Sequence, residues 1–336
     1  MKYKIMLIIF LSALLISCLP SSPTSKGKRT ITVYGFSIMK EPLEKAIYPM
    51  FKEKWRMERG EEIEFVSSFA GSETITNQIL QGSPADIAIL SIERDVDRLI
   101  KAGHVPSDWY VTPQKGIANK TPFVILVRKG NPKGINDFPD LAKEGVKLIH
   151  PDPVSSGGAQ WSILSIYGSE LLKGEKAGAR DEAKAVETLK AIWKNVISTP
   201  GSAREARTQF ETGFGDALIT YELEGLLMKE ANTPIDIIVP KSTIFSEHPV
   251  AIVDRNVTPE ERPIIEAFRN FLWTEEAQKA FVKYHFRSTT DEKLNEANPE
   301  FAKIEMPFTV QQFGGWEKAY PDVIEKIFRD QIQGTK

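Results

Sequence analysis

Short apolar strands alternate with helical stretches along most of this 336-residue chain, and this alternation limits the possible folds more than any other feature. Residues 30–34 alternate in the manner of a strand, a loop follows at 35–37, and 41–56 have a helical pattern. The segment 85–90, Ala-Asp-Ile-Ala-Ile-Leu, is almost wholly apolar, as in a strand that helices cover on both faces. Strands that alternate with helices in this way predict an α/β fold built on a largely parallel sheet.

The alternation occurs in two blocks, which predicts two lobes. A second block of strands and helices begins with the apolar strand 123–128, and the stretch 248–253 reads as the chain crossing back. The residues after 258 have a mostly helical pattern. We therefore expect two extended crossings between a lobe I formed by 30–120 plus 249–336 and a lobe II formed by 121–248.

The single cysteine of the chain, Cys18, ends a short export signal. Two lysines precede an apolar run over 5–16, and Leu-Ile-Ser-Cys at 15–18 resembles the lipobox of bacterial lipoproteins. The run is shorter than the roughly 20 residues that span a bilayer. We expect a signal peptide over 1–17, lipidation of Cys18 and a flexible linker over 18–29, which together give an exported, membrane-tethered protein. An ordinary secretory signal that contains a cysteine is the alternative.

The charge balance of the chain limits its partners. A formal net charge of −2 gives no electrostatic footprint for nucleic acid or for an anionic membrane surface. One cysteine cannot form a disulfide within the chain, so the fold depends on its core, which a 41% hydrophobic composition permits. We expect a monomer that touches the membrane only through its lipid and that holds any anionic ligand with local groups.

The sharpest local motif is the segment 151–161, Pro-Asp-Pro-Val-Ser-Ser-Gly-Gly-Ala-Gln-Trp. Its prolines end a strand, its small residues form a tight turn, and a helix is expected to open near Ala159. Gly157 and Gly158 leave their backbone N–H groups uncovered, and Ser156 adds a hydroxyl donor. Because the first N–H groups of a helix lack internal partners and carry the positive end of its dipole, this segment indicates an anion site. A plain helix cap, with glycines required by the turn, is the alternative.

Three other strand-to-helix junctions have the same character. They are Gly-Phe-Ser at 35–37, Ala-Gly-Ser at 70–72 and Gly-Ser-Ala-Arg at 201–204. In open α/β sheets, ligands bind beyond the carboxyl ends of the strands, where loops turn into helices. Four such loops in two lobes predict a cleft that hydrogen-bond donors line.

These segments resemble the periplasmic sulfate-binding proteins. The resemblance is carried by 156–161, by Phe-Val-Ile-Leu-Val-Arg-Lys-Gly-Asn-Pro-Lys-Gly at 123–134 and by Phe-Gly-Gly-Trp at 313–316, and it extends from about 31 to 330. It implies an α/β, two-lobed type II periplasmic binding fold (Venus flytrap), with a mixed sheet flanked by helices in each lobe. It also implies delivery of sulfate or thiosulfate to the permease of an ABC importer, with no cofactor and no catalysis.

The resemblance also implies a set of site residues. In that family, backbone N–H groups, serine hydroxyls and an indole N–H hold sulfate without a counter-cation. The matching ligand-binding positions in this chain are Ser37, Ser72, Ser156, Gly157, Gly158, Ala203 and Tyr221. The positions expected to support them are Gln160, Arg204 and Arg207.

This chain departs from the family pattern at some of these positions. Family members carry Asp where Ser37 stands, Arg where Gln160 stands and Trp where Tyr221 stands, and Arg207 is unexpected beside the cleft. A site made of donors alone suits a dianion such as sulfate and rejects protonated phosphate, by a factor of roughly 10⁴–10⁵. A tyrosine or serine hydroxyl that accepts a proton would relax this selection, so molybdate, tungstate and phosphate stay open as ligands.

Other functions find little support in the sequence. Residues 37–40, Ser-Ile-Met-Lys, match the S-x-x-K motif of penicillin-recognising enzymes, but no K-T-G or S-D-N follows. The four histidines are scattered without a metal-binding spacing, so no metal is expected. No G-x-S-x-G elbow or Walker loop is present, and we expect no enzyme activity. A ligand-sensing partner of a membrane receptor would use the same fold and is the remaining alternative.

Overall fold

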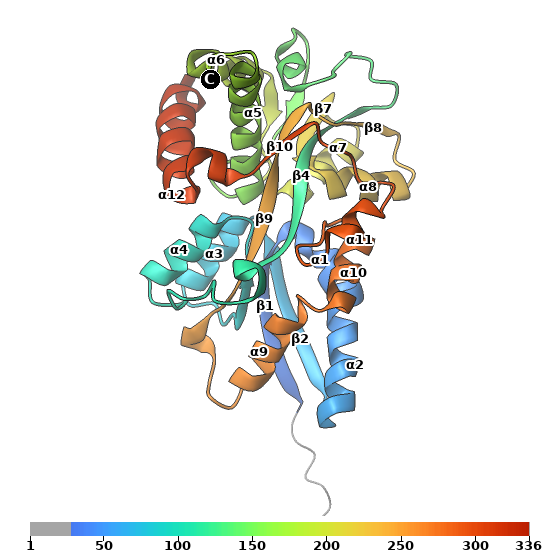
Figure 1. Ribbon diagram of the computed structural model, residues 1–336, viewed down its shortest axis with the longest axis vertical. Coiled ribbons are helices and arrows are strands. Elements are labelled where there is room, and N and C mark those ends of the chain that lie inside the picture. Colours follow the sequence, from blue (N-terminus) through green and yellow to red (C-terminus); the bar gives the residue numbers. More distant parts are fainter. Residues whose placement is uncertain (1–27, 336) are drawn as a thin grey trace, which may run out of the picture.

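The computed structural model describes residues 28–335. These residues form two lobes that are stacked along the long axis of the molecule and joined at a waist (Figure 1). The predicted two-lobed α/β architecture is therefore confirmed. The predicted signal peptide over 1–17, Cys18 and most of the predicted linker lie outside the described residues.

Lobe I contains a sheet with the strand order β2-β1-β3-β9. Strand β1 pairs in parallel with β2 and β3, whereas β9 runs antiparallel to β3. Three of these strands lie wholly in lobe I: β1 (Arg29–Phe36), β2 (Ile63–Ala70) and β3 (Ile87–Ile89). The helices of this lobe are η1 (Ser37–Met39), α1 (Lys40–Pro42), η2 (Leu43–Ile47), α2 (Tyr48–Arg59), α3 (Ser72–Leu80), α4 (Glu93–Lys101), η3 (Pro113–Gly116), η5 (Asp254–Asn256), α9 (Arg262–Phe271), α10 (Glu275–Lys283) and α11 (Glu292–Glu296).

Lobe II contains a mixed sheet with the order β4-β7-β5-β6, and β8 also pairs with β4. Strands β7 and β8 run antiparallel to β4, whereas β5 is parallel to both β6 and β7. The strands are β4 (Ile117–Arg128), β5 (Leu148–Ile149), β6 (Val196–Ser198), β7 (Ala217–Tyr221) and β8 (Ile235–Ile238). The helices between them are η4 (Phe138–Ala142), α5 (Gly157–Lys176), α6 (Glu182–Lys194), α7 (Ala203–Glu211) and α8 (Glu222–Glu230).

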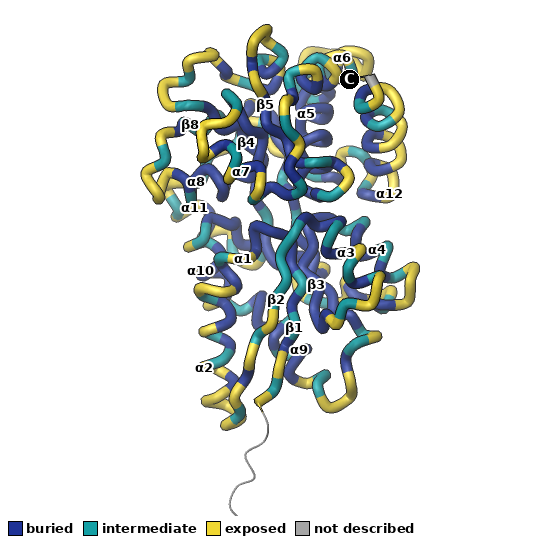
Figure 2. Tube along the Cα trace, turned by 180° about the vertical axis from the view of Figure 1, so that it is seen from behind, coloured by how far each residue is buried: buried dark blue, intermediate teal, exposed yellow. Residues whose placement is uncertain are grey.

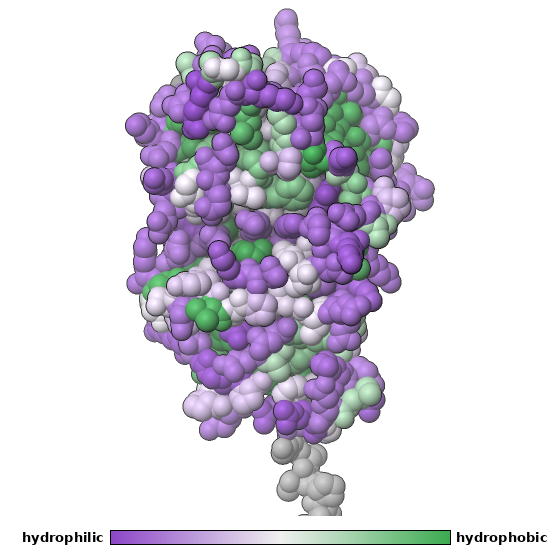
Figure 3. Space-filling model, viewed as in Figure 1, coloured by the Kyte–Doolittle hydropathy of each residue, from purple (hydrophilic) through white to green (hydrophobic). Residues whose placement is uncertain are grey.

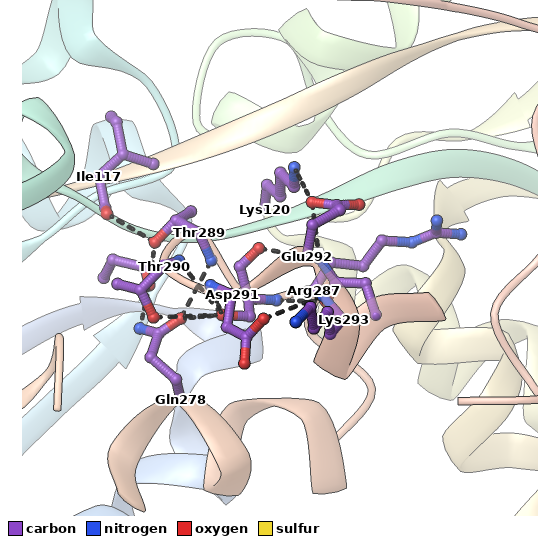
Figure 4. Close-up of polar contacts among 12 residues, drawn as sticks. Ile117, Lys120, Gln278, Arg287, Thr289, Thr290, Asp291, Glu292 and Lys293 are labelled. Atoms are coloured by element: carbon purple, nitrogen blue, oxygen red, sulfur yellow. Dashed lines mark hydrogen bonds and ion pairs between the residues drawn. The ribbon is translucent and has the colours of Figure 1, made fainter. Parts of the chain in front are cut away.

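Two long antiparallel strands, β4 and β9 (Ser242–Ile252), carry the chain through the waist. Both predicted crossings therefore exist. The loop after α10 secures the start of β4. There Thr289 Oγ1 donates to the carbonyl of Ile117 at 3.2 Å, and Lys120 Nζ lies 3.1 Å from a carboxylate oxygen of Glu292 (Figure 4).

The last part of the chain differs from the predicted boundary of lobe I. The chain passes the waist a third time, and β10 (Met306–Phe308) pairs with the lobe II end of β9. The helices that follow are η6 (Val310–Phe313), α12 (Trp316–Ala319), η7 (Tyr320–Arg329) and η8 (Gln333–Thr335). Phe328 meets Trp193 of α6 edge to face, with ring centroids 4.6 Å apart. Residues 306–332 therefore pack mainly on lobe II, where their apolar face covers α5 and α6, and they also reach lobe I, where the Arg94 guanidinium of α4 lies over the Tyr320 ring.

One large hydrophobic cluster extends from lobe I into lobe II, with Ile31, Phe123 and Phe328 among its buried members. Figure 2 shows buried segments in both lobes and through the waist between them. The face drawn in Figure 3 is mostly hydrophilic, and its hydrophobic residues form small, separate patches. Within residues 28–335, no helix combines the length and the apolar character that crossing a bilayer requires.

Candidate anion-binding site

Three helices begin at the junctions that the sequence singled out. Helix α3 begins at Ser72, α5 at Gly157 and α7 at Ala203. Among the described residues, no side chain caps α3 or α5, whereas the Ser202 hydroxyl accepts from Glu205 N at the start of α7. The uncapped N–H groups at a helix start favour an anion, because they carry partial positive charge and lack partners within the helix.

The starts of α3 and α5 meet where the two lobes touch. Residues from both lobes come together there, and we call them the neutral cluster: Ser72, Ser91, Gly157, Gly158 and Tyr221. All five are buried, and none carries a formal charge at neutral pH. Four of them were predicted from the sequence as ligand-binding residues.

Ser91 is the residue of this cluster that the sequence analysis missed, and it makes three hydrogen bonds. Its backbone N–H donates to Ser72 Oγ at 2.9 Å, within lobe I. Its other two bonds cross to lobe II: Trp161 Nε1 donates to its carbonyl at 2.7 Å, and its hydroxyl lies 2.9 Å from the Tyr221 hydroxyl. Ser91 directly follows the predicted strand 85–90, so its place at the carboxyl end of a strand is the signal that could have found it.

The glycines of the interface allow the lobes to approach closely. A Cβ on Gly157 would lie 2.8 Å from Ser91 Cβ in the other lobe. A Cβ on Gly71 would lie 2.3 Å from the carbonyl oxygen of Ser155 and 2.6 Å from that of Gly201, again across the interface. Side chains at these two positions are therefore incompatible with the closed arrangement of the lobes.

The hydroxyl groups of the cluster differ in what they can offer an anion. The Ser72 hydroxyl donates to Asp95 at 2.5 Å, so Ser72 has only its backbone N–H to give. Burial and the nearby Glu73 raise the pKa of the Asp95 carboxyl. Ser91 and Tyr221 share one hydrogen bond, so whichever hydroxyl donates, the hydrogen of the other remains for a third acceptor. Because burial raises the pKa of Tyr221, its hydroxyl keeps its proton.

The remaining predicted ligand residues lie on the same interface. Ser37 begins η1 of lobe I, which packs against α7 of lobe II, where Ala203 is the first residue. Both side chains are buried. Ser156 is the residue before α5, and its backbone N–H donates to the carbonyl of Asp152 at 2.9 Å. In this arrangement the N–H of Ser156 is already used.

The three predicted supporting residues all have partners in the protein. Gln160 Nε2 reaches across the interface and donates to Glu73 at 3.1 Å. Arg204 pairs with Glu224 of lobe II at 3.0 Å and also with Glu41 of lobe I, and Arg207 pairs with Glu224 at 2.9 Å. The guanidinium groups beside the cleft are therefore neutralised by carboxylates.

A two-lobed body in which helix starts face one another across the interface is suited to enclosing a small solute.

The chain belongs to the bacterial extracellular solute-binding protein family, whose model matches residues 31–287. It is 34% identical over 295 residues to a sulfate-binding protein of Synechococcus elongatus, which covers 87% of this chain and 83% of that protein. It is 30% identical over 314 residues to a thiosulfate-binding protein of Pseudomonas aeruginosa, which covers 92% of this chain and 93% of that protein. Among solved structures, it resembles the sulfate-binding protein SubI from Mycobacterium tuberculosis H37Rv, with a TM-score of 0.79, 32% identity and coverage of 87% of this chain and 98% of that one.

Proposed function

We propose that this chain is the extracytoplasmic solute-binding component of an ABC importer and that it encloses sulfate or thiosulfate between its lobes. The observation that carries the proposal is the convergence of the starts of α3 and α5 on the neutral cluster, with α7 and η1 meeting on the same interface. The curated relatives that bind sulfate and thiosulfate support it, because they match the chain over most of its length.

This proposal gives donor roles to five of the seven residues that the sequence indicated, and it adds Ser91. The N–H of Ser156 already bonds to the carbonyl of Asp152. Ser72, Gly157, Gly158 and Ala203 offer backbone N–H groups at helix starts, and the hydroxyl pair of Ser91 and Tyr221 offers one hydrogen. A hydrogen bond to a charged group contributes about 1.5–3 kcal/mol. The five bonds together contribute about 7.5–15 kcal/mol, against the roughly 8 kcal/mol of micromolar binding, and the surplus offsets the cost of association and closure.

Closure follows from the same contacts. The donors come from both lobes, so the anion interacts with more of them when the lobes are closed. Ser91 supports this reading because its hydroxyl and carbonyl already bond to lobe II residues Tyr221 and Trp161. The anion therefore favours the closed state by its differential affinity for it.

Another oxyanion is the second candidate, and Tyr221 is the observation that favours it. An indole N–H only donates, whereas the Tyr221 hydroxyl can also accept a proton from a protonated ligand. A protonated phosphate would then find an acceptor. Molybdate and tungstate, which are dianions like sulfate, would use the donors alone.

The export and tethering of the chain are part of the proposal. A leader over 1–17 and lipidation at Cys18 would place the two lobes outside the cytoplasm on a membrane anchor. Intact mass spectrometry of the protein from its native membrane tests this: a mass that fits a diacylated chain beginning at Cys18 is expected. A mature N-terminus at any other residue would contradict it.

Calorimetric titration with sulfate, thiosulfate, molybdate and phosphate at pH 6 and pH 8 tests the ligand. We expect sulfate or thiosulfate to bind at both pH values, because the donors that would touch the anion stay uncharged. Burial and Glu73 raise the pKa of Asp95, which accepts from Ser72, to about 8, so binding should weaken somewhat at pH 8 as that carboxyl ionises. Phosphate that gains more affinity at pH 6 than sulfate does would favour the second candidate. An absence of binding by all four anions would contradict the proposed function.

A further inference from the structure

A second constellation lies at the edge of the interlobe interface, away from the neutral cluster. One ring nitrogen of His285 and one carboxylate oxygen each of Glu230 and Glu300 lie within 4.8 Å of one another. The His285 side chain is 2% exposed, whereas those of Glu230 and Glu300 are about half exposed. No metal site was expected from the sequence, because the members of this group are widely spaced along the chain.

The imidazole of His285 has no hydrogen-bond partner among residues 28–335, although carboxylates surround it. Its Nε2 lies 3.1 Å from Glu230 Oε1 and its Nδ1 lies 3.5 Å from Glu300 Oε2, but neither contact has the geometry of a hydrogen bond. A buried polar group without a partner is costly, so an unseen partner is expected. The partner must be attracted by two carboxylates and by an imidazole.

A divalent cation meets these requirements. Zinc bonds to histidine nitrogen and carboxylate oxygen at about 2.0–2.2 Å, so two ligands of a tetrahedral site lie roughly 3.4 Å apart. One nitrogen of His285 and one oxygen from each carboxylate lie within 4.8 Å of one another, and small rotations of the half-exposed Glu230 and Glu300 side chains would bring them to that spacing. Imidazole with carboxylates favours zinc and related transition metals over calcium or magnesium, which prefer oxygen alone. Three protein ligands leave a fourth position for water.

The position of this group gives it a mechanical consequence. Glu230 is the last residue of α8, which packs on β4, β7 and β8 of lobe II. His285 follows α10 of lobe I, and Glu300 lies beyond α11, before the chain returns to lobe II. The other end of α8 is also tied to this segment, because the carboxylate of Glu222 accepts charge-assisted bonds from Nε and Nη2 of Arg287 at 2.9–3.1 Å. A cation bound by Glu230, His285 and Glu300 would therefore fasten α8 to lobe I at both of its ends.

We propose that Glu230, His285 and Glu300 form a site for a divalent cation of the zinc class, which bridges the lobes at the end of α8. The site is separate from the neutral cluster, and the proposal does not depend on which anion the cleft takes. A cation held by ligands from both lobes binds the closed state better than the open one, so it shifts the equilibrium toward closure.

Calorimetric titration of untagged, metal-stripped protein with zinc chloride tests the proposal. We expect saturable binding of one Zn²⁺ per chain, weakened at least tenfold in Glu230→Gln and in Glu300→Gln. Glu296→Gln serves as the matched control, because Glu296 is an exposed carboxylate on α11 in the same segment, and it should bind Zn²⁺ like the unmodified chain. His285→Gln should also lose binding, with its fold checked by circular dichroism.

Each Glu variant tests one lobe, and both side chains are exposed enough for substitution without unfolding. Loss in both variants supports a bridging site. The proposal is overturned if the unmodified chain takes up no Zn²⁺ at 1:1 stoichiometry, or if either Glu230→Gln or Glu300→Gln binds as tightly as the Glu296→Gln control.

Discussion

The interface between the lobes has two regions of opposite character. The neutral cluster at its centre joins the lobes through hydroxyls, backbone groups and glycines, whereas the region around Arg204 joins them through ion pairs. In the second region, Arg204 and Arg207 both contact Glu224, which is fully buried, so that the positive charges already have partners. The arginines beside the cleft are therefore not needed to hold the anion. They are occupied by carboxylates, and the uncharged dipoles of the centre remain for the ligand.

The largest effect is expected from placing a charge in the neutral region. Gly157→Asp brings a carboxylate to the start of α5, beside the proposed anion and against Ser91. An uncompensated buried charge costs about 3–5 kcal/mol, so the Kd for sulfate should rise by roughly 10²–10⁴.

Gly157→Asn is the matched control for this change, because it has nearly the same size and no charge. Calorimetry should show that Asn weakens binding less than Asp does. Equal Kd values for the two variants would mean that size alone disturbs the site, and unchanged affinity in both would remove Gly157 from it.

The pH dependence of stability tests whether the neutral region stays uncharged. Its neighbour His248 donates from Nδ1 to Asn119 Oδ1 at 2.6 Å, and burial lowers the pKa of His248 to about 3. Below about pH 6.5 the unfolded chain binds a proton at His248, whereas the folded chain keeps this histidine neutral down to about pH 3. The neutral His248 therefore contributes fully to the free energy of unfolding above pH 6.5, and this contribution is lost as the pH falls toward 3. Between pH 6.5 and 4.5 the free energy of unfolding should fall by roughly 2–3 kcal/mol from this residue alone.

His248→Asn isolates that contribution, because other groups titrate in both proteins and cancel in the comparison. Urea denaturation at pH 7 and pH 4.5 should show a smaller loss in the variant than in the unmodified chain. Identical losses would show that His248 becomes protonated inside the folded waist.

Gly71, which need not touch the anion, tests whether ligand binding depends on the close approach of the lobes. Gly71→Ala places a methyl group against the carbonyls of Ser155 and Gly201, and the clash is relieved when the lobes open. Overpacking of this kind costs about 1–3 kcal/mol, which weakens sulfate binding by roughly 5- to 150-fold without unfolding either lobe. Gly201→Ala is the control, because its new Cβ comes closest to the flexible side chain of Glu205, at 3.2 Å, and its next neighbour is the Ser155 hydroxyl at an ordinary 3.7 Å. Equal affinities of the two variants, measured by calorimetry, would contradict the closure mechanism.

The smallest effect is expected from Tyr221→Phe. The change removes one hydroxyl bond between the lobes, to Ser91, and keeps the ring. A hydrogen bond of this kind contributes about 0.5–1.5 kcal/mol, so sulfate should bind roughly 2- to 12-fold more weakly. If the Tyr221 hydroxyl accepts from protonated ligands, phosphate binding at pH 6 should fall further than sulfate binding does. An equal change for both anions would show that the hydroxyl does not select between them.

Much of the fold could be predicted from the sequence, because strand and helix patterns are local. The helices expected after 70–72 and 201–204 begin at Ser72 and Ala203, as α3 and α7. The position of the last 30 residues could not be predicted. Their helical pattern shows that one face is apolar but not which sheet or helix it covers, and the contact of Phe328 with Trp193 of lobe II is visible only in three dimensions.

The candidate site also contains residues that a local sequence pattern indicated and residues that only the structure brought together. Gly157 and Gly158 were found because two glycines before a helix are a signal within a few residues of sequence. Ser91 was missed, since its partners Tyr221 and Trp161 are far away along the chain and in the other lobe. Arg204 and Arg207 were expected to support the ligand site, and only the structure shows that both pair with Glu224.

A crystal structure of the chain grown with sulfate would show which groups hold the anion. We expect the anion to lie between the starts of α3, α5 and α7, where it accepts hydrogen bonds from backbone N–H groups and from the Ser91–Tyr221 hydroxyl pair. A sulfate held mainly by the guanidinium groups of Arg204 and Arg207, or bound to a metal ion, would contradict it.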